Sequence, residues 1–249
     1  MIGRVFVRAL AVAIGLIALW TALHAALALP PFVLPGPWDV AGAFAERGGM
    51  LLRNAAITAS EMVIGLLIGV AAGVVTALAI ASTPFVRRIL LPPVVVTQSL
   101  PVFAIAPLLV VWLGYGMASK IVMAALIIYF PVATAYADAM VRAPRDLIDM
   151  ARFHGATPVQ LLFLVRAPFG VPGLAAGLKV AATVAPIGAV VGEWVGSSAG
   201  LGYVMLHANA RLQTDVVFAA LILLAALALL LRSLVESLAR RLAPWQEET

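Results

Sequence analysis

Long apolar stretches, separated by short polar segments, set the pattern of this chain. A helix that crosses a bilayer needs about 20 mostly apolar residues, because each residue adds only about 1.5 Å to its length. Six stretches reach or approach that length. They are Val5–Leu29, Ala55–Ala81, Val94–Leu113, Ile121–Ala137, Val171–Val195 and Val216–Leu231. The pattern predicts an all-α integral membrane protein with about six transmembrane helices.

Composition agrees with this class. The 249 residues are 64% hydrophobic and 11% charged, whereas globular proteins average about 45–50% apolar and about 25% charged residues. The chain has no cysteine, which excludes disulfides, thiolate zinc sites and cysteine nucleophiles. His24, His154 and His207 fall in separate parts of the predicted topology, so they predict no metal cluster and no catalytic triad.

The first apolar stretch has two interpretations. Arg4 and Arg8 precede it, and Ala26-Leu27-Ala28 resembles the small-residue cleavage site of a signal peptide. The stretch is longer than a typical signal-peptide core, which favours a helix that is kept.

The basic residues predict how the chain is oriented. With the N-terminus inside, eleven basic residues fall on the cytoplasmic side: Arg4, Arg8, Arg87, Arg88, Arg142, Arg145, Arg152, Arg166, Arg232, Arg240 and Arg241. Four fall outside, namely Arg47, Arg53, Lys120 and Arg211, and Lys179 lies within the fifth span. The positive-inside rule therefore places both termini in the cytoplasm. Topology also explains the net charge of +5, so we expect no nucleic-acid partner.

Glycines recur at four-residue spacing in two of the spans. Gly65, Gly69 and Gly73 do so in the second span, and Gly188 and Gly192 in the fifth. Small residues at this spacing let helix backbones approach closely in a membrane. No linker, charge run or repeat divides the chain, so we expect one transmembrane domain over 1–249, with its core at about 51–240.

A charged segment interrupts the apolar pattern between the fourth and fifth spans, in the loop 138–168. Its letters "DLIDMARFHGATPVQLLFLVRAPFGVP" begin at Asp146. Acidic residues start a predicted helix that ends at Phe153. Gly155 then allows a turn. Thr157-Pro158 predicts the start of a second short helix that runs through Val165. Pro168 and Pro172 mark the start of the fifth span. These residues alone fit an amphipathic connector and a docking element equally well.

The spacing within this loop resembles the EAA signature of binding-protein-dependent ABC importer permeases. That signature reads Glu-Ala-Ala, three residues, Gly, nine residues and Ile-x-Leu-Pro. Asp149-Met150-Ala151 stands at the triplet, Gly155 at the glycine and Val165-Arg166-Ala167-Pro168 at the closing group, with Met150 and Ala167 departing from the pattern. The resemblance implies a type I ABC importer permease fold. It also implies a coupling helix that enters a cleft of a cytoplasmic ATPase through Asp149, Met150, Ala151, His154, Gly155 and Ala156.

Three further segments extend the resemblance over most of the chain. "TQSLPVFAIAPLLVVWLGYG" from Thr97, "APIGAVVGEWVGSSAGLGYVM" from Ala185 and the closing "RRLAPW" resemble the nitrate/sulfonate/taurine branch. Within it they are most similar to permeases for pyrimidine precursors of thiamine, such as hydroxymethylpyrimidine.

The resemblance implies a bacterial inner-membrane homodimer with two kinds of partner. One is a pair of cytoplasmic ABC ATPase subunits, and the other is an extracytoplasmic substrate-binding protein. The chain has no Gly-x-x-x-x-Gly-Lys-[Ser/Thr] motif. We therefore expect this subunit to bind no cofactor and to catalyse no reaction, with ATP and Mg²⁺ held by the ATPase.

Polar and aromatic residues within the spans are candidates for a translocation pathway or gate, because polar groups are costly in lipid. The candidates are Gln98, Ser99, Phe103, Glu193 and Trp194. Prolines surround Gln98 and Ser99, which fits either a cavity wall or a kinked packing helix. Glu193 could equally snorkel to the outer interface or pair with another helix. We expect Glu61 at the outer interface and Lys179 reaching towards the cytoplasm.

Two other classes of protein are alternatives to the importer. An ion-gradient-driven carrier working alone often contains two related halves, and no convincing inverted repeat is present. Gly196-Ser197-Ser198-Ala199-Gly200 fits the Gly-x-Ser-x-Gly nucleophile elbow, which would make Ser198 the centre of an intramembrane hydrolase. That elbow needs a preceding strand, whereas a membrane helix is predicted there.

Overall fold

The computed structural model describes residues 2–27, 29–99 and 101–244, and within them it does not describe the side chains of residues 2–10, 13, 98 and 99. All the regular elements of this part are helices, which confirms the all-α prediction. They are α1 (Ile2–Leu27), α2 (Pro37–Ser82), α3 (Pro84–Ser99), α4 (Val102–Leu113), α5 (Met117–Val141), α6 (Arg145–Phe153), α7 (Pro158–Gln160), the π-helix η1 (Leu161–Arg166), α8 (Ala167–Gly196), α9 (Leu201–Ala210) and α10 (Thr214–Leu242).

Four helical segments of the described chain are long and apolar enough to cross a membrane. They are Pro37–Ser82, Met117–Val141, Pro158–Gly196 and Thr214–Leu242, and they contain the predicted second, fourth, fifth and sixth spans. The pair α3 and α4 supplies a fifth if it counts as one broken span. The predicted number of six is reached only when α1, whose described apolar part runs over Ile14–Leu27, is counted as well.

The predicted span Val94–Leu113 is sharply bent in the structure. The chain divides it between α3 and α4, and the segments Pro84–Thr97 and Val102–Leu113 meet at 94°. Pro101 is the N-cap of α4, and a proline disfavours helical backbone in the residue before it. That residue, Leu100, lies outside the described part of the chain.

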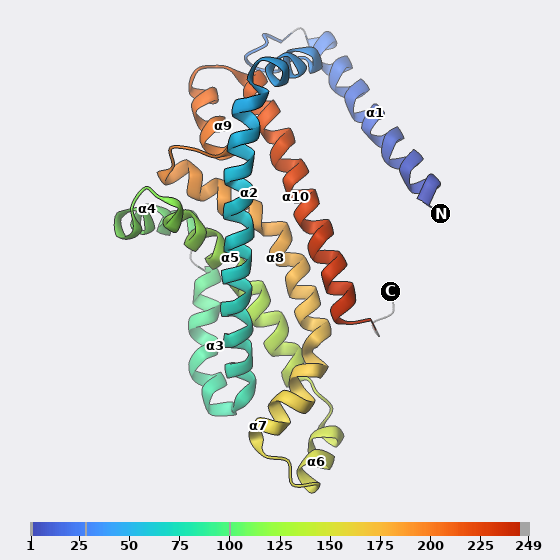
Figure 1. Ribbon diagram of the computed structural model, residues 1–249, viewed down its shortest axis with the longest axis vertical. Helices are drawn as coiled ribbons and strands as arrows, with labels where there is room; N and C mark the ends of the chain where they lie inside the picture. The colour runs from blue at the N-terminus through green and yellow to red at the C-terminus, as the bar shows by residue number, and fades with distance from the viewer. Residues whose placement is uncertain (1, 28, 100, 245–249) are drawn as a thin grey trace.

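Helix α5 forms the centre of the bundle, with α2 and α8 packed along it (Figure 1). Both glycine rows face α5. A Cβ on Gly65 would lie 2.6 Å from the Cβ of Ala124, and one on Gly188 would lie 2.6 Å from the Cα of the same alanine. Ala124 is fully buried. Glycine therefore permits three helix backbones to meet at one point.

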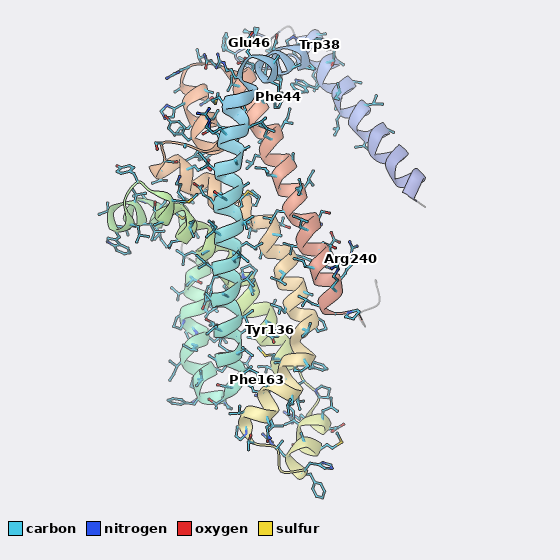
Figure 2. All side chains as sticks on the ribbon, in the orientation of Figure 1. Trp38, Phe44, Glu46, Tyr136, Phe163 and Arg240 are labelled. Atoms are coloured by element: carbon cyan, nitrogen blue, oxygen red, sulfur yellow. The ribbon has the colours of Figure 1, made fainter. Side chains whose placement is uncertain are left out.

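The bundle has two distinct ends (Figure 1). The start of α2 and the short helix α9 lie at one of them, which we name the α9 end; Trp38, Phe44 and Glu46 lie there (Figure 2). Helices α6 and α7 lie at the opposite end, named the α6 end. Helix α1 diverges from the bundle, and its Trp20 donates to the carbonyl of Pro35 at 3.0 Å near the α9 end.

Candidate functional site

Helix α6 presents an exposed face at the α6 end of the bundle. Ile148 is buried in a small cluster with Leu161, whereas Met150 and Phe153 are 58% and 89% exposed. Asp149 lies 3.5 Å from Arg152, and both side chains are largely exposed, so this pair contributes little to stability. The helix is thus held on one side and leaves its other side free for a partner.

The turn after α6 depends on Gly155. Its φ is +81°, a backbone conformation that glycine adopts without strain. Its N–H donates to the carbonyl of Arg152 at 2.9 Å, and the N–H of Ala156 donates to that of Ala151 at 3.0 Å. These bonds satisfy carbonyls at the end of α6, so the glycine fixes the direction in which the chain leaves the helix.

The second short helix of this loop is not separate from the fifth span. Thr157 caps it as predicted, because the N–H of Gln160 donates to the Thr157 hydroxyl at 3.3 Å. The chain then continues through η1 into α8 without a break. Pro168 has no N–H group to donate to the helix. It lies in the first turn of α8, directly after the π-helical turns of η1. The helix continues across it.

The same region is anchored to the bundle by Tyr136, which Figure 2 labels. This buried side chain on α5 donates from its hydroxyl to the carbonyl of Ala167 at 3.3 Å. Phe163 on η1 is exposed by contrast. The start of α8 is therefore tied to α5, while one face of η1 remains open.

A buried ion pair lies towards the α9 end. The Nζ of Lys120 on α5 is 2.7 Å from Oε1 of Glu61 on α2, and it donates to the Ser197 hydroxyl at 2.9 Å. Glu61 is fully buried and Lys120 is 6% exposed. The expected position of Glu61 at an outer interface is wrong, because its carboxylate is enclosed by the helices and paired with a lysine that we assigned to an outer loop.

Glu193 belongs to a network that holds the start of α9. It is 1% exposed and accepts hydrogen bonds from the hydroxyl of Thr58 at 2.6 Å and from the N–H of Gly202. Of the two structural alternatives for Glu193, pairing with a neighbouring helix is confirmed and snorkelling is excluded.

Three side chains outside α9 accept the first backbone N–H groups of that helix. Gly202 donates to Glu193, Leu201 donates to Thr58 at 2.8 Å, and Gly200 donates to Asn54 at 2.8 Å. The first N–H groups of a helix have no partner within it, and the N-cap residue here is a glycine without a side chain. The buried polar cluster therefore replaces a local cap.

The sequence contained a signal for this cluster that we missed. Asn54, Thr58, Glu61 and Gly65 follow one another at spacings of four, three and four residues, which places them on one face of a helix. Polar residues that continue a glycine row predict a buried polar contact at the end of that row.

A groove runs along α5 on the side of the break between α3 and α4. Its volume is about 510 Å³. Its lining comes from α3, α4, α5 and α8: Thr97, Val102, Leu126, Ile127, Phe130, Pro131, Thr134, Ala135, Asp138, Ala176, Gly177, Val180 and Val184. We name it the α5 groove. Its described lining is mainly apolar and includes three polar residues.

The predicted pathway residues do not line this groove in the described part of the chain. Glu193 lies in the buried network, whereas Phe103 and Trp194 are 67% and 51% exposed. The side chains of Gln98 and Ser99 lie outside the described part, although their backbone closes α3 next to the groove residue Thr97.

Comparisons with known proteins agree on one family. The model of the family described as "Binding-protein-dependent transport system inner membrane component" matches residues 65–244. A probable ABC transporter permease of Haemophilus influenzae is 45% identical, covering 91% of this chain and 92% of its own length. A riboflavin transport permease of Chloroflexus aurantiacus is 35% identical (93% and 87% covered), and a formylaminopyrimidine transport permease of Halalkalibacterium halodurans is 29% identical (88% of each).

The fold is similar to that of a solved transporter chain. The match is to the inward-facing MetNI methionine ABC transporter, with a TM-score of 0.68 and 22% identity, covering 79% of this chain and 98% of that chain.

Proposed function

The chain belongs to the family of binding-protein-dependent transport system inner membrane components and is a permease subunit of an ABC importer, and we propose that it moves a small solute delivered by an extracytoplasmic binding protein. Its likeness to the MetNI chain confirms the expected type I permease fold. Hydrolysis of ATP, with its Mg²⁺, takes place on separate subunits in this proposal. The permease itself would work as a homodimer in the bacterial inner membrane.

The exposed face of α6 is the observation that carries this proposal. Met150 and Phe153 form an apolar surface at one end of the bundle, and apolar side chains left exposed in this way are suited to a protein partner. The ATPase would contact α6 and the following turn through Asp149, Met150, Ala151, His154, Gly155 and Ala156. The α6 end and both termini are then cytoplasmic, and the α9 end faces the binding protein.

The solute proposed here is a pyrimidine precursor of thiamine. Two observations support it: a relative is named a formylaminopyrimidine permease, and the α5 groove is mainly apolar, as suits a flat heterocycle. The same machinery importing sulfonate, taurine or nitrate is the alternative, since a taurine permease is also a relative. An ion-gradient-driven carrier is the second alternative.

Uptake into proteoliposomes tests the proposal. The vesicles would hold this chain with its ATPase and binding protein, and labelled aminopyrimidine would be compared with an alkanesulfonate, each with and without ATP. ATP-dependent uptake of the pyrimidine alone is the expected result. ATP-dependent uptake of the sulfonate alone would keep the importer and remove the proposed solute, and ATP-independent uptake would favour the carrier.

The variant Asp149→Arg tests the role of α6. It reverses an exposed charge without removing a buried contact, so the chain should reach the membrane but lose ATPase association and uptake. Normal association and normal uptake would contradict the proposed coupling surface. Gln98→Leu provides a second comparison, since unchanged uptake in that variant would remove Gln98 from the predicted pathway.

A further inference from the structure

We propose that the α5 groove admits solutes that carry hydrogen-bond donors and no net negative charge, and that Asp138 makes it reject anions. The inference rests on the proposed importer function, because it treats the groove as part of the solute path. It goes further in naming a class of solute and the residue that selects it.

The polar residues among the described lining of the groove all present acceptors. The hydroxyl of Thr134 donates its hydrogen to the carbonyl of Phe130 at 2.9 Å, and that of Thr97 donates to the carbonyl of Val94 at 2.6 Å. A hydroxyl has one hydrogen to donate and two lone pairs, so both groups have only lone pairs left for a solute. Asp138, the third polar residue, is an acceptor when ionised.

No compensating cation lines the groove among the described residues. Among the described residues of its lining, Asp138 is the only charged one, and its side chain is exposed. The ion pairs of the described chain join other residues. Arg142 lies one helical turn further along the chain, yet it forms no ion pair with Asp138. No ion pair among the described residues therefore engages this carboxylate.

The helix that carries Asp138 adds to this negative potential. Asp138 lies in the last turn of α5, which ends at Val141, and the C-terminal end of a helix carries a partial negative charge. Phe130, Thr134 and Asp138 follow at four-residue spacing and all line the groove, so they form one stripe. An aromatic ring, a hydroxyl acceptor and a carboxylate thus succeed one another along the path.

This arrangement distinguishes between the solutes of the relatives. A flat heterocycle with an amino group can pack its ring on the apolar lining and donate N–H groups to the acceptors. A sulfonate needs donors and finds none among these three side chains. Like charges about 6 Å apart disfavour the anion by about 10- to 100-fold for effective dielectric constants of about 40 to 20.

The absence of native cysteine permits a direct test of the potential. Thr134→Cys introduces a single thiol of similar size into the groove. Its rates of modification by a cationic and by an anionic methanethiosulfonate reagent would be measured in liposomes and normalised to the rates with a free thiol. We expect the cationic reagent to be favoured by about 10- to 100-fold, and Asp138→Asn to remove most of this preference.

Glu236→Gln in the same Thr134→Cys background is the matched control, because it removes a carboxylate from α10 outside the groove. The preference should survive there. An equal rate for both reagents, or a preference that Asp138→Asn leaves unchanged, would overturn the inference. This arm needs no ATPase and no binding protein, so it does not depend on whether the importer is active.

Transport provides the second arm. At saturating binding protein, Asp138→Asn should lower the maximal rate of aminopyrimidine uptake about tenfold, the effect of exchanging a charged acceptor for a neutral amide oxygen, and Asp138→Glu should restore part of it. ATP-dependent uptake of the alkanesulfonate at the rate of the pyrimidine would overturn the inference while the importer stands. ATP-independent uptake would instead refute the importer, whatever the reagents report.

Discussion

Replacing Glu193 by alanine should loosen the start of α9. The wild-type carboxyl group accepts hydrogen bonds from Thr58 and from the N–H of Gly202, and in the variant Gly202 keeps a buried donor without this partner. Leaving such a donor unsatisfied costs about 1–3 kcal/mol. The Thr58 hydroxyl loses less, because the carbonyl of Asn54 lies 3.2 Å away as a second acceptor.

The total cost includes the space left by the missing side chain. Adding about 1 kcal/mol for the cavity that the missing side chain leaves gives a loss of about 2–4 kcal/mol in the free energy of unfolding. For a chain of this size, each kcal/mol lowers the Tm by about 2–4 °C. The Tm of Glu193→Ala should therefore fall by about 5–15 °C.

Thermal unfolding of the purified chain in nanodiscs, followed by circular dichroism, measures this loss. Thr183→Ala is the control on the same helix, since its exposed hydroxyl donates only to the carbonyl of Lys179 within α8, and its effect should stay within about 0.5 kcal/mol. Glu193→Gln keeps an acceptor oxygen and should fall between the two. A Tm for Glu193→Ala within about 2 °C of the control would refute the capping role.

Three further predictions concern the turn after α6, the glycine rows and the ion pair. Gly155→Pro should abolish ATP-dependent uptake while the chain stays in the membrane. Proline fixes φ near −65°, whereas Gly155 has a φ of +81°, so the turn after α6 cannot keep its conformation. Uptake at the wild-type rate would contradict this prediction. Gly69→Ala should lower the Tm, because the added Cβ would lie 2.8 Å from a backbone oxygen of α5. Gly42→Ala is the control and should leave the Tm unchanged, because its Cβ would have no atom within 4 Å. Equal changes in Tm for the two variants would exclude the close approach of α2 and α5. Lys120→Met should lower the free energy of unfolding by about 3–5 kcal/mol. Adding Glu61→Met should recover most of that loss. If the two losses are instead additive in a double-mutant cycle, the pair is not coupled.

The sequence predicted the parts of the fold that depend on local rules. Apolar runs located the membrane segments because span length is set by bilayer thickness. Helix α6 was predicted within one residue at its start, since an acidic first turn, a turn glycine and the Thr157 cap all act over a few residues. The prolines around Gln98 and Ser99 indicated a possible kink in the third span. They did not predict a division into two helices that meet at 94°, because the apolar composition continues through Pro101.

The buried network could not be read from the sequence in the same way. Glu61 and Lys120 are 59 residues apart by their numbers. Glu61 was expected at the outer interface because it lies near the end of a span, and Lys120 was placed outside by the positive-inside rule. Their pairing depends on how α2 and α5 are brought together, which the glycine row permits but does not specify. Asp138 was missed for a similar reason, since its groove forms only when four helices meet.

The continuity of the helix from Pro158 to Gly196 has a mechanical consequence. Its 39 residues make a rod about 58 Å long at about 1.5 Å per residue. One end begins beside α6, and Glu193 near the other end holds α9. A tilt of about 5° around the middle of such a rod displaces its two ends by about 2.5 Å in opposite directions. That displacement approaches the length of a hydrogen bond, so a tilt of this size with α9 held in place would separate Glu193 from the first turn of α9.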